Sequence, residues 1–133
     1  MTEDEGWGGI MEDARAEALL EFVVGGVTYT LPADEIEQIA EVYKGEVYPL
    51  LEDREPLLGM LNLHGQVVPL VRFPFGDVVK EKNGKFVCII AKKEDLKFVF
   101  PIDYVSQVRA QSKGKPLTVT EVWQKIKNGE KGL

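Results

Sequence analysis

The side chains best able to do chemistry in this sequence are isolated from one another. His64 is the only histidine and Cys88 the only cysteine, so neither has the companions that a histidine or cysteine metal site requires. Acidic residues cluster at Glu3-Asp4-Glu5 and at Glu52-Asp53-Arg54-Glu55, where nothing nearby would desolvate them and shift a pKa. We interpret both clusters as solvated surface rather than as paired acid and base groups.

The contexts of the histidine and the cysteine favour contact and packing roles over catalysis. His64 precedes Gly65 in a turn, where a histidine is usually solvated or in contact with a partner. Cys88 lies inside the apolar run Phe86–Ala91, which predicts a small buried hydrophobe rather than a reactive thiol. The sequence has no phosphate loop, dinucleotide fingerprint, nucleophile elbow or metalloprotease helix. We therefore predict a binding protein with no catalytic residue, metal or cofactor.

The composition narrows the class of partner and the compartment. A formal net charge of −6 and a pI near 4.9 repel nucleic acids and anionic membranes, so neither is expected as a partner. A hydrophobic fraction of 44% is sufficient for a core. The single cysteine, the acidic first residues and the lack of an apolar stretch of about 18 residues predict a cytoplasmic protein without membrane insertion.

From Leu19 onward, short runs of β-branched and aromatic residues alternate with turn signals. The pairs Gly25-Gly26 and His64-Gly65 each separate two such runs, as in tight β-hairpins whose turns need positive φ. Pro69 cannot donate to a ladder, so its strand should be at a sheet edge or carry a bulge. Strands this short and frequent predict small barrels. The expected strands are Leu20–Val24, Val27–Leu31, Val42–Val47, Leu57–Leu63, Gln66–Phe73, Phe86–Ala91, Phe98–Ile102 and Val105–Val108.

Helical spacing occurs in three places. Residues 1–18 are predicted to be a flexible or short helical segment ahead of a domain that spans 19–133. Ile36 and Ile39 are three residues apart, which predicts one helical turn. A C-terminal helix is predicted over 119–128, with a capping box of Thr118 and Glu121 and an apolar face that should be buried. That face comprises Val119, Val122, Trp123 and Ile126.

The segment Pro56–Leu70 carries a more specific pattern. An apolar-Gly-apolar run leads into Asn62-Leu63-His64-Gly65, followed by an apolar pair, Pro69 and Leu70. This pattern resembles the signature hairpin of CheW-like domains, which occur in the coupling proteins of bacterial chemosensory signalling. The segment from Phe22 to Ile39 resembles the opening hairpin and apolar-x-x-Ile turn of that family. The segment from Phe100 to Val105 resembles its closing apolar-Asp-x-Val element, so the resemblance covers about 19–110.

The resemblance implies a fold and a set of partners. The fold would be mainly β, with two small SH3-like five-stranded β-barrels packed together, a short central helical turn and a C-terminal helix. The function would be that of a non-catalytic adaptor, recruited to membrane receptor arrays. Its partners would be the regulatory domain of a CheA-type histidine kinase and the cytoplasmic tip of a methyl-accepting chemoreceptor. The partner-binding residues that the resemblance implies are Ile36, Gln38, Ile39, Asn62, His64, Gly65, Ile102, Asp103 and Val105.

Three departures from the family pattern affect these expectations. His64 stands where the family has arginine, so we expect partner binding that strengthens when this histidine is protonated. The aspartate common after the Pro-apolar pair is replaced near Arg72-Phe73, which reverses the local charge. Residues 111–116 lead almost directly to the C-terminal helix, where the family has two further strands. One barrel is therefore expected to be incomplete, with an open edge.

Several alternatives remain open from the residues alone. Asp103 could cap a turn or contact a partner. The open edge could support a homo-oligomer, or the N-terminal segment could cover it in the same or a neighbouring chain. The protein could also be a divergent CheW-like protein that competes with the coupler or serves another pathway. A small-molecule site in the crevice between the barrels is a further alternative.

Overall fold

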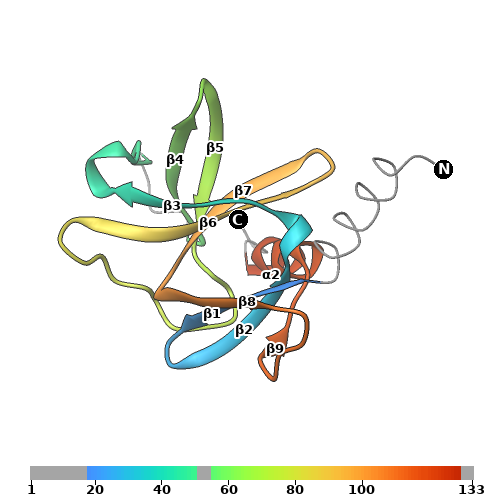
Figure 1. Cartoon of the computed structure of the whole chain (residues 1–133). Coiled ribbons are helices and arrows are strands. Elements are labelled where there is room, and N and C mark those ends of the chain that lie inside the picture. The colour runs from blue at the N-terminus through green and yellow to red at the C-terminus, as the bar shows by residue number, and fades with distance from the viewer. Residues whose placement is uncertain (1–17, 51–54, 130–133) are drawn as a thin grey trace, which may run out of the picture.

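Nine short strands make up most of the chain that the structure, a computed structural model, describes, namely residues 18–50 and 55–129 (Figure 1). The predicted N-terminal segment, apart from residue 18, lies outside the described residues. In chain order the elements are β1 (Leu19–Val24), β2 (Val27–Pro32), the 3-10 turn η1 (Ala33–Glu35), β3 (Ile36–Tyr43), the 3-10 turn η2 (Lys44–Glu46), β4 (Leu57–Leu63), β5 (Gln66–Val71), β6 (Lys85–Lys93), β7 (Leu96–Ile102), β8 (Tyr104–Arg109), β9 (Lys115–Pro116) and the helix α2 (Val119–Gly129).

The strands form two curled sheets. One has four strands in the order β8-β1-β2-β9, and the other has five in the order β3-β6-β7-β5-β4. Tyr48, which follows β3, exchanges two backbone hydrogen bonds of 2.9 and 3.0 Å with Met60 of β4, so the five-stranded sheet curls towards closure. In Figure 1 the β4–β5 hairpin stands at the top and the four-stranded sheet lies at the bottom, with β6 and β7 between them. The mainly β prediction is confirmed.

The β6–β7 hairpin lies between two hydrophobic cores. Side chains alternate across a strand, so Ile89 and Phe100 enter the larger core while Cys88 and Val99 enter the smaller one. The larger core also takes side chains from β1, β2 and α2, and the smaller one from β3, β4 and β5. Four aromatic rings meet in the larger core with centroids 5.0 to 6.0 Å apart, an arrangement that adds directional packing to the burial of apolar area. They are Phe22, Tyr29, Phe73 and Phe100.

The predicted helical turn at Ile36 and Ile39 is wrong, because both residues belong to β3. The 3-10 turn η1 ends just before them. The register explains the misleading spacing: Ile36 pairs with Ala91 and Ile39 with Ile89, and the extra residue between these pairs forms a β-bulge at Glu37. A bulge inserts one residue, so positions three apart face the same side of the sheet as they would on a helix. The predicted strand Val42–Val47 likewise ends early, since η2 begins at Lys44.

The expectation for Pro69 is also corrected. Its strand β5 is an inner strand between β4 and β7, and the bulge of the β4–β5 pair lies in β4, between Leu57 and Gly59. Met60, which stands opposite Pro69, directs its backbone N–H and C=O to Tyr48. The Met60–Pro69 pair is therefore a non-hydrogen-bonded pair, so the missing backbone N–H of Pro69 removes no hydrogen bond to β4. On the other side, the pairing of β5 with β7 is recorded only at Leu70, one residue beyond the proline.

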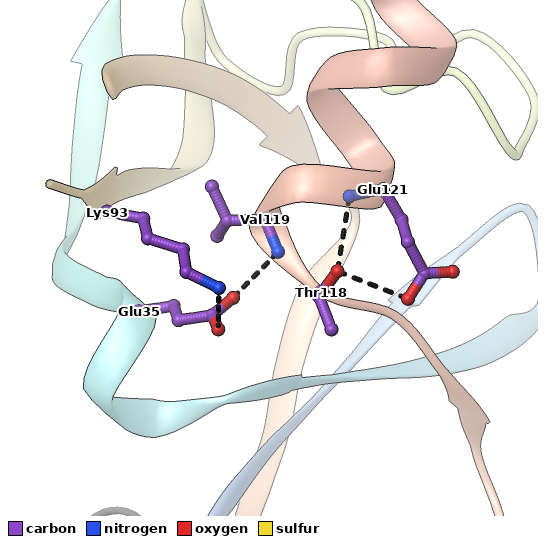
Figure 2. Close-up of polar contacts among 5 residues, drawn as sticks. All are labelled: Glu35, Lys93, Thr118, Val119 and Glu121. Carbon is purple, nitrogen blue, oxygen red and sulfur yellow. Dashed lines mark hydrogen bonds and ion pairs between the residues drawn. The ribbon is translucent and has the colours of Figure 1, made fainter. Parts of the chain in front are cut away.

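The start of α2 is held by two carboxylates (Figure 2). The Glu121 backbone N–H donates to Thr118 Oγ1 at 3.1 Å, so the threonine half of the predicted capping box forms. The Glu121 carboxylate accepts the Thr118 hydroxyl at 3.1 Å, where the box would have it accept the Thr118 backbone N–H. Glu35 of η1 accepts the Val119 backbone N–H at 2.7 Å and the Lys93 ammonium at 3.4 Å. An otherwise unpaired amide at the helix N-terminus is thus satisfied by a residue 84 positions earlier in the chain.

The apolar face of α2 packs as predicted, with one difference. Val119, Val122 and Ile126 are buried in the larger core. Trp123 is only half-buried, and its ring packs at the edge of this core on Phe98, with centroids 5.1 Å apart. The helix is therefore part of the core, and the tryptophan covers it rather than filling it.

The segment that replaces the two expected strands is fixed to the four-stranded sheet by one carboxylate. Glu21 of β1 is only 7% exposed and accepts hydrogen bonds from the Ser112 hydroxyl and, at 3.1 Å, from the Gln107 amide. The Arg109 guanidinium lies 3.8 Å from it. The two-residue strand β9 then pairs in parallel with β2 and covers part of the β2 edge of the four-stranded sheet. Along β8, on the opposite edge, no further strand pairs within the described residues.

We expect Glu35→Ala to lower the free energy of unfolding by about 1–3 kcal/mol, because the Val119 amide loses its acceptor in a partly buried position. Urea unfolding measures the change. Asp34→Ala is the matched control, since Asp34 lies in the same turn and is exposed. Equal losses of unfolding free energy in the two variants would show that the hydrogen bond from Val119 to Glu35 does not stabilise the protein.

We also expect a pH dependence from Glu21. The hydrogen bond from Ser112 is the main cause that holds the pKa of Glu21 below its usual range. The hydrogen bond from Gln107 and the charge of Arg109 also lower this pKa, while burial opposes them. A carboxyl whose pKa is lowered by folding contributes stability above its unfolded pKa of about 4.3, and this contribution is lost as the pH falls through the folded pKa. Glu21→Gln should therefore be less stable than the wild type at pH 7. The gap in urea midpoints should narrow steadily between about pH 5 and 3.

The matched pair for this test is Ser112→Ala against Ser106→Ala. Ser112 donates to the carboxylate, whereas Ser106 is an exposed residue of β8. Ser112→Ala should lose part of the pH dependence, and Ser106→Ala none of it. A gap between wild type and Glu21→Gln that stays constant with pH would contradict the assignment.

Candidate partner-binding surfaces

The nine predicted partner-binding residues fall into two groups in the structure. Ile36, Gln38 and Ile39 lie in the first half of β3, and Asn62, His64 and Gly65 lie in the β4–β5 hairpin. Ile102, Asp103 and Val105 lie where the chain crosses from β7 to β8. The two groups are at opposite ends of β7, whose first residues neighbour the β4–β5 hairpin. Five residues of extended strand, from Lys97 to Ile102, span about 17 Å.

The His64-Gly65 turn is built to expose the histidine. Both residues have positive φ, 51° and 86°, as a two-residue hairpin turn requires. The Asn62 side chain accepts the Gly65 backbone N–H through Oδ1 at 2.9 Å and so closes the turn. Asn62 and Gly65 thus set the conformation, and His64 is left exposed at the tip.

Charged groups next to this tip form a cluster that the sequence pattern did not predict. Glu37, the bulged residue of β3, lies 2.8 Å from the Lys97 ammonium and 3.8 Å from that of Lys92. Lys97 also donates to the Gln66 side chain at 3.2 Å, which ties β7 to the hairpin that carries His64. The hydrogen bond from Lys97 is the main cause that lowers the pKa of Glu37. The charges of Lys97, Lys92 and His64 also lower it, while desolvation opposes them. Glu37 and His64 therefore belong to one electrostatic surface.

Beside this cluster β3 presents apolar side chains to solvent. Ile39 is 38% exposed, while Ile36 is half-buried against the larger core. Gln38 is exposed. Tyr43, also exposed, lies at the far end of β3, where it pairs with Lys85. The first surface, defined here as His64, Glu37, Gln38 and Ile39, extends over both faces of the edge strand β3, because Gln38 pairs with Ile90 of the smaller core and Ile39 with Ile89 of the larger one. It combines apolar and charged groups, which is the usual composition at the centre and rim of a protein interface.

The second group is built around Asp103. Its carboxylate accepts the Gly25 backbone N–H at 2.7 Å, and its own N–H donates to the Val23 carbonyl at 3.0 Å. Asp103 therefore caps the Gly25-Gly26 turn, the first of the two roles left open by the sequence. Ile102 is 1% exposed and belongs to the larger core. We define the second surface as Asp103, Val105 and Tyr104, of which Tyr104 is 54% exposed.

Sequence reasoning missed Glu37, Lys97 and Tyr104. Nothing in the pattern marks Glu37 and Lys97, because their pairing depends on a bulge and on the neighbouring ends of β3 and β7. Tyr104 could have been found, since it lies directly between two predicted residues. An exposed tyrosine is a frequent contact residue in interfaces.

The hollows of the described surface are open to solvent. One of about 650 Å³ is lined by Glu21, Val27, Thr28 and the 109–115 segment, on the outside of the four-stranded sheet. Another of about 340 Å³ lies between Pro56, Phe73 and Ile126. Within residues 18–50 and 55–129 no group of three metal-ligating side chains occurs, and no helix there is long and apolar enough to cross a membrane. Burial raises the pKa of Cys88 to about 12, which agrees with its predicted packing role.

Two curled sheets, with one hairpin of the five-stranded sheet packed between their two cores, define a small β-barrel scaffold that displays exposed turns. The family model described as CheW-like domain matches residues 18–125, and the chain belongs to this family of chemotaxis scaffold and adaptor proteins. The fold is similar to that of the scaffolding protein TtCheW from Thermoanaerobacter tengcongensis, with a TM-score of 0.61 at 19% identity. That match covers 72% of this chain and 66% of the other, just under two thirds of its length. No curated protein sequence matches the chain. The predicted two-barrel fold of this family is confirmed.

We expect Asp103→Ala to lower the free energy of unfolding by about 1 kcal/mol, because the Gly25 amide loses its acceptor. Asp103→Asn keeps an oxygen acceptor at the same position and should retain most of the stability. Urea unfolding of both variants is the measurement. Identical midpoints for alanine, asparagine and wild type would show that the cap is dispensable and would leave contact with a partner as the remaining role of Asp103.

Proposed function

We propose that this protein is a non-catalytic coupling adaptor. Its partners would be the cytoplasmic tip of a methyl-accepting chemoreceptor and the regulatory domain of a CheA-type histidine kinase. It would act in the cytoplasm, where binding to the receptor recruits it to membrane arrays. The family membership supports this class of function, and the partners follow from the resemblance of the signature hairpin.

One observation carries the proposal: the predicted residues form two separate surfaces instead of one concave site. The first surface lies on β3 and at the tip of the β4–β5 hairpin in the five-stranded sheet, and the second lies where β7 passes into β8 of the four-stranded sheet. An adaptor needs two surfaces that two partners can occupy together. Because both are attached to one packed hairpin, their relative position is fixed, which lets a shift in one partner bias the other.

The first surface offers a specific recognition chemistry. Lys97 and Lys92 neutralise Glu37, which leaves His64 as the exposed imidazole at the hairpin tip that a partner can contact. A partner surface adapted to a cationic residue would bind the protonated imidazole more tightly than the neutral one. Ile39 would supply apolar contact area.

The test is reconstitution with purified parts. The full chain should form a ternary complex with a receptor-tip helical hairpin and a kinase regulatory domain, seen by size-exclusion chromatography with light scattering. The double variant Ile39→Ala/His64→Ala should weaken one partner by about tenfold or more, and Tyr104→Ala/Val105→Ser should weaken the other. His64→Arg should remove the pH dependence of the affinity for the partner that the first double variant weakens.

The matched control is Val67→Ala, an exposed apolar residue of β5 outside both surfaces, at 61% exposure. It should bind both partners normally. The proposal fails if neither partner binds the wild type, if the two partners exclude each other, or if both double variants weaken the same partner.

A further inference from the structure

The outside of the four-stranded sheet carries a groove whose lining, among the described residues, has more basic than acidic side chains. The groove is the hollow of about 650 Å³ described above, and its basic side chains are Arg109, Lys113 and Lys115, all exposed. Within residues 18–50 and 55–129, Lys113 and Lys115 pair with no carboxylate. The one acid in the lining, Glu21, is buried and already held by Ser112, Gln107 and Arg109. The groove therefore has an excess of positive charge.

The chain itself contains a segment of opposite charge. Residues 1–17 include six acidic residues and one basic residue, a net charge of −5, whereas the whole chain carries −6. Almost all of the net negative charge of the protein thus belongs to a segment that precedes β1. The same segment contains the apolar residues Trp7, Ile10 and Met11.

The point of attachment brings this segment to the groove. β1 begins at Leu19, which pairs with Arg109 at one end of the groove, and Thr28 at its other end pairs with Val23. Four residues of strand separate these points, about 13 Å. Trp7 is twelve residues ahead of Leu19, a stretch that spans about 18 Å as a helix and more when extended. Trp7 can therefore reach Val27 and Thr28 in either conformation.

We propose that residues 1–17 dock in cis on this groove as a built-in acidic ligand. The carboxylates would face Arg109, Lys113 and Lys115, and Trp7 would cover the apolar part of the floor at Val27 and the Thr28 methyl group. The docked segment lies across the outside of the four-stranded sheet, whose edge strands are β8 and the two-residue β9. It would take the place on this sheet that two further strands occupy in the family pattern. The inference is independent of the partners proposed above.

The experiment uses the full chain with Trp123→Phe, which leaves Trp7 as the only tryptophan and keeps an aromatic ring on Phe98. Acrylamide quenching of Trp7 is measured at about 0.02 M and about 0.5 M NaCl, since added salt screens charge pairs on the surface. We expect protection at low salt. At high salt, or in Lys113→Glu/Lys115→Glu at low salt, the quenching constant should rise by about twofold or more. The matched control, Lys80→Glu/Lys82→Glu, reverses two exposed lysines of a different hollow and should keep the protection.

A second measurement needs no tryptophan substitution. Cleavage after Arg15 by an arginine-specific protease should be slow in the wild type at low salt and faster in Lys113→Glu/Lys115→Glu. Charge exchange, with Glu3, Asp4 and Glu5 changed to lysine in that variant, should restore the slow rate. The proposal is overturned if Trp7 is equally quenched in all variants and salts, or if only the Lys80/Lys82 reversal exposes it. Protection that disappears on dilution would overturn docking in cis and assign the groove to a second copy of the chain.

Discussion

The rest of the structure depends on the alternation of side chains along the β6–β7 hairpin. One face of this hairpin supplies Ile89 and Phe100 to the larger core, and the other supplies Cys88 and Val99 to the smaller one. A strand that is buried on both faces cannot shift register without exchanging the contents of two cores at once. The hairpin therefore fixes the two sheets relative to each other, and with them the two candidate surfaces at its ends. The coupling adaptor proposed above would use this fixed geometry to hold its two partners in a defined arrangement.

Two carboxylates connect the end of the domain to its beginning. Glu35 binds the first amide of α2, and Glu21 binds Ser112 in the segment before it. Both contacts join residues more than 80 positions apart. They show how the abbreviated region after β8 stays folded without the additional strands of the family pattern. Two carboxylate contacts and one helix cover the part of the sheet with which longer strands would otherwise pair.

The candidate surfaces depend on backbone conformation as much as on side chains. Positive φ at His64 and Gly65 exposes the imidazole at a hairpin tip, and the bulge at Glu37 brings a carboxylate to the same end of the molecule. Asp103, at the other end of β7, accepts the Gly25 backbone N–H and so holds the turn of the β1–β2 hairpin. The geometry of these turns is already set before binding, which reduces the entropy lost on association. Their residues are therefore suited to the proposed contacts.

The sequence by itself determined the class of fold, most hairpins and the C-terminal helix. These features rest on local rules: glycine pairs that permit positive φ, alternation within strands, and a Thr118–Glu121 cap that closes over one turn. It also marked Asn62, His64 and Gly65, whose conformation is decided within a single hairpin. The tertiary structure alone decided the rest. Ile36 and Ile39 belong to a strand because a bulge fits them to Ala91 and Ile89, and Ile102 is buried because two sheets meet over it. Glu37 joins the surface of His64 because Lys97 comes from another strand, and such pairings depend on register between distant segments, which no local pattern encodes.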